Sequence, residues 1–147
     1  MKDSKFKELD HRVGAYQVVS RSTEVAKGYK PDVTVEDTNK QLAFILECEQ
    51  KTDRKAFLGD LVKAEKHAEE RRACPVLVIV MEPLPNSTVQ QIADHLAPYA
   101  KWLVHRNGGT LCLSGVLIMS DDEYERSFQA NGLLTSQEFR ARATVVA

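Results

Sequence analysis

Two acidic residues at alternate positions end an apolar segment of this 147-residue chain. Residues 43–46 are apolar and predict a buried strand, after which Glu47 and Glu49 follow with Cys48 between them. Side chains alternate faces along a strand, so both carboxylates would project to one side and Cys48 to the other. Two buried like charges are costly unless a cation or a proton is shared between them. The pattern therefore favours a divalent metal site.

A third acid, Asp32, comes from the segment that precedes this strand. Residues 31–35 predict a strand, residues 36–40 a turn, and residues 41–50 the second strand of a hairpin. The hairpin would bring Asp32 close to the Glu47 end of its partner strand. Asp32 is therefore the nearest upstream candidate for a further metal ligand.

The segments after the hairpin predict an α/β domain. Residues 75–81 have no polar interruption and are typical of a central strand that is covered on both faces. A helix over residues 89–103, which Pro98 would kink or divide, and a strand over residues 111–119 continue the alternation. The first helix follows the hairpin directly, and its apolar stripe consists of Phe57, Leu58, Leu61, Val62, Ala64 and Ala68.

The chain has the length of one domain, which we place over residues 1–147. Its core is expected over about residues 13–119, where residues 13–20 form either a first strand or the continuation of a helix. Residues 120–147 are interpreted as a C-terminal helical or loop extension used for packing, dimerisation or substrate contact.

Composition indicates a soluble, cytoplasmic globular protein with no membrane partner. Hydrophobic residues make up 43% and charged residues 28% of the chain, and no apolar run approaches the ~20 residues of a membrane helix. Cys48, Cys74 and Cys112 are widely spaced in apolar segments and predict reduced core residues. The net charge is −1, so any contact with nucleic acid must come from local basic patches.

The order of these features resembles the PD-(D/E)XK nuclease superfamily. The resemblance covers roughly residues 29–82 and is carried by Pro31-Asp32, Glu47-Cys48-Glu49 and the helical segment Asp60-Leu61-Val62-Lys63-Ala64. It implies a restriction-endonuclease-like fold, in which helices flank a mixed central β-sheet. It also implies a DNA endonuclease that depends on Mg²⁺ or Mn²⁺ and acts as a homodimer or within a larger nucleoprotein assembly.

The resemblance further implies roles for individual residues. Asp32, Glu47 and the backbone carbonyl of Cys48 would bind Mg²⁺. Glu49 stands where the superfamily usually has lysine, and it would orient or deprotonate the attacking water, while Lys51 would offset charge on the phosphate. An alternative register that uses Glu49 and Lys51 restores the usual spacing of acid and lysine. That register places a polar residue where an inward apolar residue is expected.

The candidate nucleic-acid contacts are basic residues near these acids in the sequence: Lys30, Arg54, Lys55 and Lys63. Exposed loops and helices carry such charges routinely. For each of these residues, the alternative is therefore an ordinary surface position without a function. The three acids also have an interpretation without a metal, as a polar strand end whose carboxylates pair with neighbouring lysines and arginines.

A different function class also fits the sequence. Replication-relaxation proteins of mobile elements similarly combine a Pro-Asp strand with an apolar strand that ends in two spaced acids. The chain would then be a non-catalytic accessory module that binds DNA or protein. Metal binding separates this interpretation from a nuclease, and no feature of the sequence decides between DNA and RNA as the substrate.

Overall fold

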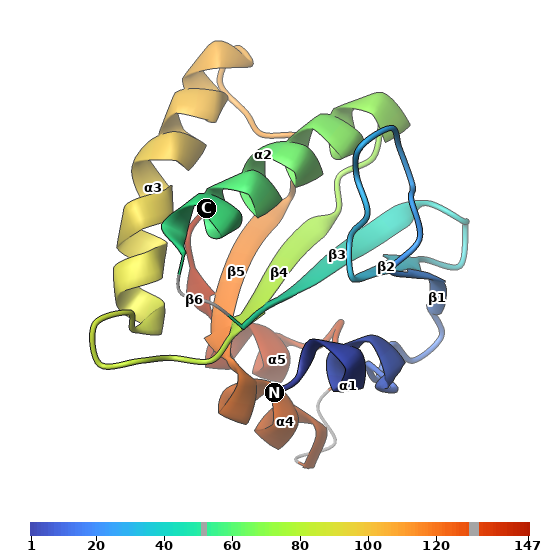
Figure 1. The fold of residues 1–147 in the computed structure, drawn as a ribbon. Coiled ribbons are helices and arrows are strands. Elements are labelled where there is room, and N and C mark those ends of the chain that lie inside the picture. The colour runs from blue at the N-terminus through green and yellow to red at the C-terminus, as the bar shows by residue number, and fades with distance from the viewer. Residues whose placement is uncertain (51–52, 130–132) are drawn as a thin grey trace.

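Six strands form one mixed sheet in which the spatial order follows the order along the chain (Figure 1). The computed structural model describes residues 1–50, 53–129 and 133–147. The strands are β1 (Gln17–Arg21), β2 (Val33–Glu36), β3 (Leu42–Glu49), β4 (Val76–Met81), β5 (Gly115–Ser120) and β6 (Thr144–Val145). The first three are antiparallel, β3, β4 and β5 are parallel, and β6 returns antiparallel to β5. The prediction of an α/β fold with a mixed sheet flanked by helices is confirmed at this level.

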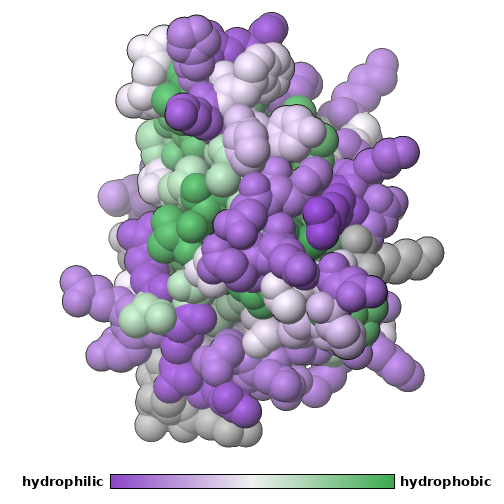
Figure 2. Space-filling view, turned by 90° about the vertical axis from the view of Figure 1, so that its left-hand side faces the viewer, coloured by the Kyte–Doolittle hydropathy of each residue, from purple (hydrophilic) through white to green (hydrophobic). Residues whose placement is uncertain are grey.

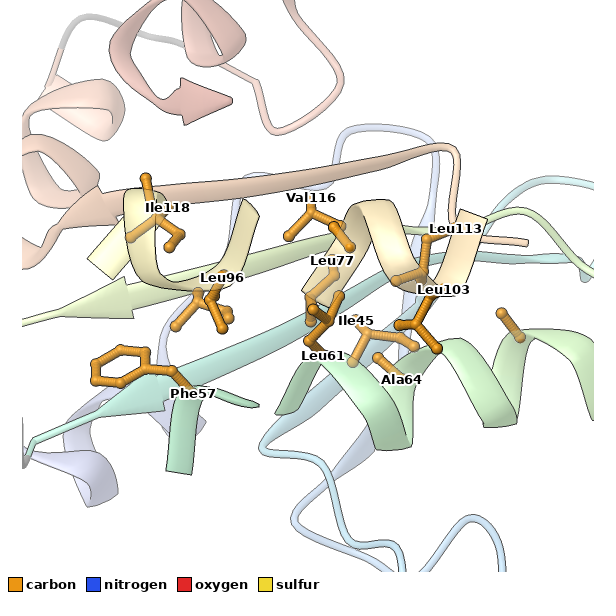
Figure 3. Packing of buried hydrophobic residues seen from close by; sticks show 14 of the residues in the cluster. Ile45, Phe57, Leu61, Ala64, Leu77, Leu96, Leu103, Leu113, Val116 and Ile118 are labelled. Atoms are coloured by element: carbon orange, nitrogen blue, oxygen red, sulfur yellow. The ribbon is translucent and has the colours of Figure 1, made fainter. Parts of the chain in front are cut away.

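Helices cover both faces of the sheet. They are α1 (Asp3–Glu8), α2 (Arg54–Arg71), α3 (Val89–Arg106), α4 (Asp121–Gln129) and α5 (Gln137–Arg142). On one face α2 and α3 connect the parallel strands, as crossover connections require (Figure 1). Their side chains form a hydrophobic cluster with the strands (Figure 3), in which Phe57, Leu61, Leu96, Ile45 and Leu77 take part.

The opposite face is covered by the two ends of the chain. Phe6 of α1, Tyr124 of α4 and Phe139 of α5 are fully buried in a second hydrophobic cluster, together with Leu46 and Val78 of the sheet. Residues 120–147 therefore contribute two helices and an edge strand to the packing of the sheet.

The predicted strands over residues 41–50 and 75–81 are confirmed as β3 and β4, and β4 is buried between β3 and β5. The strand expected over residues 111–119 was placed too early, because β5 begins only at Gly115. Pro98 does not divide α3, which runs without interruption to Arg106. The loss of one intrahelical hydrogen bond at a proline is tolerated here because the helix is anchored to the core along its length.

The late start of β5 has a specific cause in Glu65 of α2. Its buried carboxylate accepts hydrogen bonds from the backbone N–H groups of Cys112 and Leu113, at 2.9 Å each, and from Asn107 Nδ2 at 2.9 Å. These donors are therefore satisfied by a side chain instead of a neighbouring strand. Glu65 thereby joins α2 to the connection between α3 and β5.

Replacing Glu65 with alanine should lower the free energy of unfolding by about 3 kcal/mol, because two backbone N–H groups lose their acceptor. Urea denaturation followed by circular dichroism measures this change. Glu69→Ala removes an exposed acid one turn later on the same helix and should cost less than about 0.5 kcal/mol. Equal losses in the two variants would show that the Glu65 carboxylate is not a structural anchor.

Candidate functional site

Asp32 and Glu47 are held side by side by reciprocal hydrogen bonds across the β2–β3 hairpin. Val33 pairs with Leu46 in the antiparallel register, so Asp32 lies next to Glu47. The backbone N–H of Cys48 donates to Asp32 Oδ2 at 2.7 Å, and the backbone N–H of Asp32 donates to Glu47 Oε2 at 3.2 Å. The predicted hairpin and the proximity of its two acids are therefore present in the structure.

Because side chains alternate between the two faces of a strand, Glu47 and Glu49 lie on one face of β3 and the Cys48 side chain lies on the other. Glu47 is 6% exposed and its Oε1 accepts a hydrogen bond from the hydroxyl of Tyr29 at 3.2 Å. Cys48 lies in the hydrophobic cluster on the opposite face of the sheet. Burial, followed by the nearby charge of Asp32, raises the pKa of the Cys48 thiol to about 12. The thiol is therefore a core side chain, and only the backbone of this residue faces Asp32.

Helix α2 brings a fourth acid to the hairpin. Asp53 caps the helix by accepting a hydrogen bond from the backbone N–H of Lys55 at 3.0 Å, and Asp60 follows two turns later. Asp60 Oδ2 is buried and has no hydrogen-bond partner within residues 1–50, 53–129 and 133–147. A buried carboxylate oxygen without a partner is unfavourable, so this position is poised to receive a proton or a cation.

The acids share a hollow of about 530 Å³ at the carboxyl end of β3, next to α1 and the beginning of α2 (Figure 1). Its acidic lining consists of Asp3, Asp32, Glu47, Glu49, Asp53 and Asp60. The lysines that line it are Lys30 and Lys63. The hollow is open to solvent on one side and closed by the sheet on the other, because Glu47 is buried while Lys30 and Lys63 are exposed.

Desolvation raises the pKa of three of these carboxyl groups. Burial and then the charge of Asp32 raise the pKa of Glu47 to about 8. Burial raises the pKa of Asp32 to about 6, although the hydrogen bond from Cys48 opposes the shift. Burial, followed by the charge of Glu47 and a side-chain hydrogen bond with Glu49, raises the pKa of Asp60 to about 11. At neutral pH Asp60 and most of Glu47 therefore hold their protons, so the hollow carries less negative charge than its number of carboxyl groups implies.

Of the four basic residues predicted to contact nucleic acid, two line this hollow and two do not. Lys30 and Lys63 line it, whereas Arg54 and Lys55 are exposed on the first turn of α2 and lie outside its lining. Lys51 lies outside the described residues, so the role expected for it has no structural description here.

A lysine from α1 also reaches the acids, a contact that sequence reasoning missed. Lys7 Nζ lies 2.7 Å from Asp3 Oδ2 and 3.6 Å from Asp32 Oδ1. No role was predicted for Tyr29 or Asp60 either. For Asp60, however, the sequence does contain a signal. Asp60 falls between Phe57 and Ala64 on the apolar stripe of α2, where an acid is unexpected.

The donor chemistry of the hollow fits a hard divalent cation. Carboxylate and carbonyl oxygens are the ligands that Mg²⁺ prefers, and Asp60 Oδ2 has no protein partner. In the part of the chain that the structure describes, no three His, Cys, Asp or Glu side chains are arranged as a metal-binding group. The carboxylates of Asp32 and Glu47 are instead turned toward backbone N–H donors. The residue types thus fit Mg²⁺, and the positions of the side chains are those of hydrogen-bonded acids.

Comparison with protein-family models, with curated proteins and with solved structures gives no match to this chain. Among the described residues, no helix combines the length and the hydrophobicity needed to cross a lipid bilayer.

The raised pKa of Glu47 predicts how stability depends on pH. The folded protein holds this proton more tightly than the unfolded chain, so the contribution of Glu47 is complete below about pH 4.5 and is lost as the pH rises through about 8. Between these values, the unfolding free energy of wild type should fall relative to that of Glu47→Gln, on the order of 5 kcal/mol. Urea denaturation over this pH range measures the difference.

Glu125→Gln is the matched control, because this carboxylate forms only an exposed ion pair with Lys5. Its stability curve should run parallel to that of wild type within about 0.5 kcal/mol. If Glu47→Gln also ran parallel, Glu47 would not be a desolvated acid.

Proposed function

We propose that this chain is a DNA endonuclease that uses Mg²⁺ or Mn²⁺ to hydrolyse phosphodiester bonds. The observation that carries the proposal is the shared hollow in which Asp32, Glu47, Glu49 and Asp60 meet, where one buried carboxylate oxygen has no hydrogen-bond partner among the described residues. Structural acids are normally paired, whereas acids that bind a cation or transfer protons are kept desolvated and close together. The resemblance to the PD-(D/E)XK superfamily rests on the same residues.

In this proposal, Asp32, Glu47 and the Cys48 carbonyl hold the metal ion, with Asp60 as a further acid of the hollow. When bound, the ion would polarise the scissile phosphate and make a bound water more acidic. Backbone N–H groups hold Asp32 and Glu47 beside each other, and their carboxylates would have to turn from these donors to bind the ion. The Tyr29 hydroxyl holds Glu47 from the opposite side.

The remaining side chains of the hollow have roles in proton transfer and charge balance. The carboxylate of Glu49 accepts or orients the proton of the attacking water, a task that is usually assigned to lysine in the superfamily. Lys63 lines the same hollow and supplies a positive charge near the phosphate and the leaving oxygen. Lys30 lies on the same rim and contacts the nucleic-acid backbone.

A restriction-endonuclease-like fold is part of the proposal. It is supported by the antiparallel meander β1–β3, which is followed by α2 and the parallel strand β4, with the acids at the end of the third strand. A homodimer is proposed because a domain of this size covers only part of a duplex. The accessory-module interpretation gives no reason for Asp60 Oδ2 to be buried without a hydrogen-bond partner among the described residues.

Purified protein should nick supercoiled plasmid or branched DNA in the presence of Mg²⁺ or Mn²⁺. Asp32→Asn and Glu47→Gln should each reduce this cleavage by at least about 100-fold, because each removes a ligand charge. The same variants should lose the rise in melting temperature that Mn²⁺ produces in wild type. Asp122→Asn, which changes an exposed acid of α4, should behave like wild type in both measurements.

Cleavage that survives in both site variants would contradict the proposal. Absence of both cleavage and metal-induced stabilisation in wild type would favour the non-catalytic accessory module.

Lys63 provides a second test of the mechanism. Lys63→Gln should lower the cleavage rate by about tenfold or more while leaving Mn²⁺ stabilisation in place, since the lysine balances substrate charge. Lys66→Gln is the matched control, because Lys66 is exposed one turn away and pairs with Glu70 at 2.7 Å. Equal rates for the two variants would place Lys63 among the ordinary surface lysines of α2.

A further inference from the structure

The outward face of α3 exposes aromatic side chains that the core does not use. Tyr99 is 40% exposed and Trp102 is 55% exposed, and the ring of His95 lies 5.6 Å from the ring of Tyr99. Residues spaced by three and four positions share one face of a helix, so these rings form a single stripe. Pro98 and Tyr99 line a shallow hollow of about 450 Å³ together with Trp102.

Helix α3 is foremost on the side of the molecule that Figure 2 presents. Polar residues cover most of the surface in that view, and hydrophobic residues occupy a smaller area. A large ring that is more than half exposed on such a surface buries little area in the fold. The exposed rings are therefore available to a partner.

The same part of the chain carries positive charge without acids. From His95 to Ser120 the sequence contains no aspartate or glutamate. The guanidinium of Arg106 lies 5.6 Å from the centre of the Trp102 ring. Neither Lys101 nor Arg106 takes part in an ion pair within residues 1–50, 53–129 and 133–147.

A separate hollow, which shares no lining residue with the first, lies toward the end of the helix. It has a volume of about 540 Å³ and is lined by Lys101, Val104, His105, Gly108 and Gly109. Lys101 precedes Trp102 by one position and therefore does not share the face of the stripe, whereas Arg106 follows Trp102 by four positions and does. Aromatic platforms beside cations are the pattern that binds unpaired bases and their phosphates.

We propose that this face of α3 binds single-stranded nucleic acid, with bases stacking on Tyr99 and Trp102 and a phosphate contacting Arg106. Unpaired bases expose their faces to such rings, whereas the bases of a duplex are already stacked on one another. The binding does not depend on the acid hollow being catalytic.

Charge distinguishes this partner from a second copy of the chain. Two copies that meet through α3 would bring the same basic residues together. The only acid of the helix is Asp94, and its Oδ1 already accepts a hydrogen bond from Gln90 at 2.9 Å. A polyanion provides the charge complement that a second copy lacks.

Trp102 makes the proposal directly measurable, because it is the only tryptophan in the chain. Titration with an oligodeoxythymidylate of about 15 nucleotides, in EDTA to exclude cleavage, should quench its fluorescence. An oligouridylate of the same length should also quench it, and a duplex should do so much less. Because no metal is present, this result is independent of whether the acid hollow binds Mg²⁺.

Variants then test each contact by fluorescence anisotropy of a labelled oligonucleotide. Trp102→Ala should weaken binding by about tenfold, and Trp102→Phe should restore most of the affinity because a stacking ring is kept. Arg106→Gln should reduce the salt dependence of log K by about 0.7, the contribution of one phosphate contact on a single strand. Arg72→Gln makes the same change of charge at an exposed position beyond the end of α2 and should leave the salt dependence unchanged.

Two results would overturn the proposal. The first is the absence of fluorescence quenching together with equal affinities of wild type and Trp102→Ala. The second is concentration-dependent self-association in sedimentation velocity that Trp102→Ala abolishes while oligonucleotide affinity stays the same. That second result would assign the exposed rings of α3 to an interface between copies of this chain.

Discussion

The candidate site depends on the pair of backbone hydrogen bonds that join Asp32 and Glu47. Each acid accepts from an N–H group on the other strand of the hairpin, so the carboxylates are placed by main-chain geometry. A one-residue change in the register of β2 and β3 would turn either side chain to the other face of the sheet. The apolar residues of β3, which are buried on both faces, hold this register and therefore also hold the acids in place.

Burial of these acids opposes folding, and the rest of the structure compensates for it. Asp32, Glu47 and Asp60 are desolvated to the point that their pKa values rise, which disfavours the folded state at neutral pH. Two hydrophobic clusters, one on each face of the sheet, supply the opposing free energy. Glu65 shows the contrasting arrangement, since this buried carboxylate accepts three hydrogen bonds and serves the fold.

The two surfaces discussed above have opposite character. The hollow at the end of β3 is rich in carboxyl groups, while the outer face of α3 has exposed rings and an arginine that forms no ion pair with the described residues. A net charge of −1 conceals this separation, because acidic and basic groups cancel in the total. Local charge is therefore more informative than isoelectric point about where a polyanion would contact this protein.

The sequence by itself determined the mixed α/β character, the β2–β3 hairpin and the shared face of Glu47 and Glu49. These follow from hydrophobic periodicity and turn residues, which act between near neighbours. Tertiary structure alone decided that Asp60 and Lys7 join the acids, that Glu65 delays β5, and that α4, α5 and β6 complete the sheet packing. These contacts join residues far apart in the chain, and their free energies depend on burial. A local sequence pattern does not indicate which side chains become desolvated when the helices pack against the sheet.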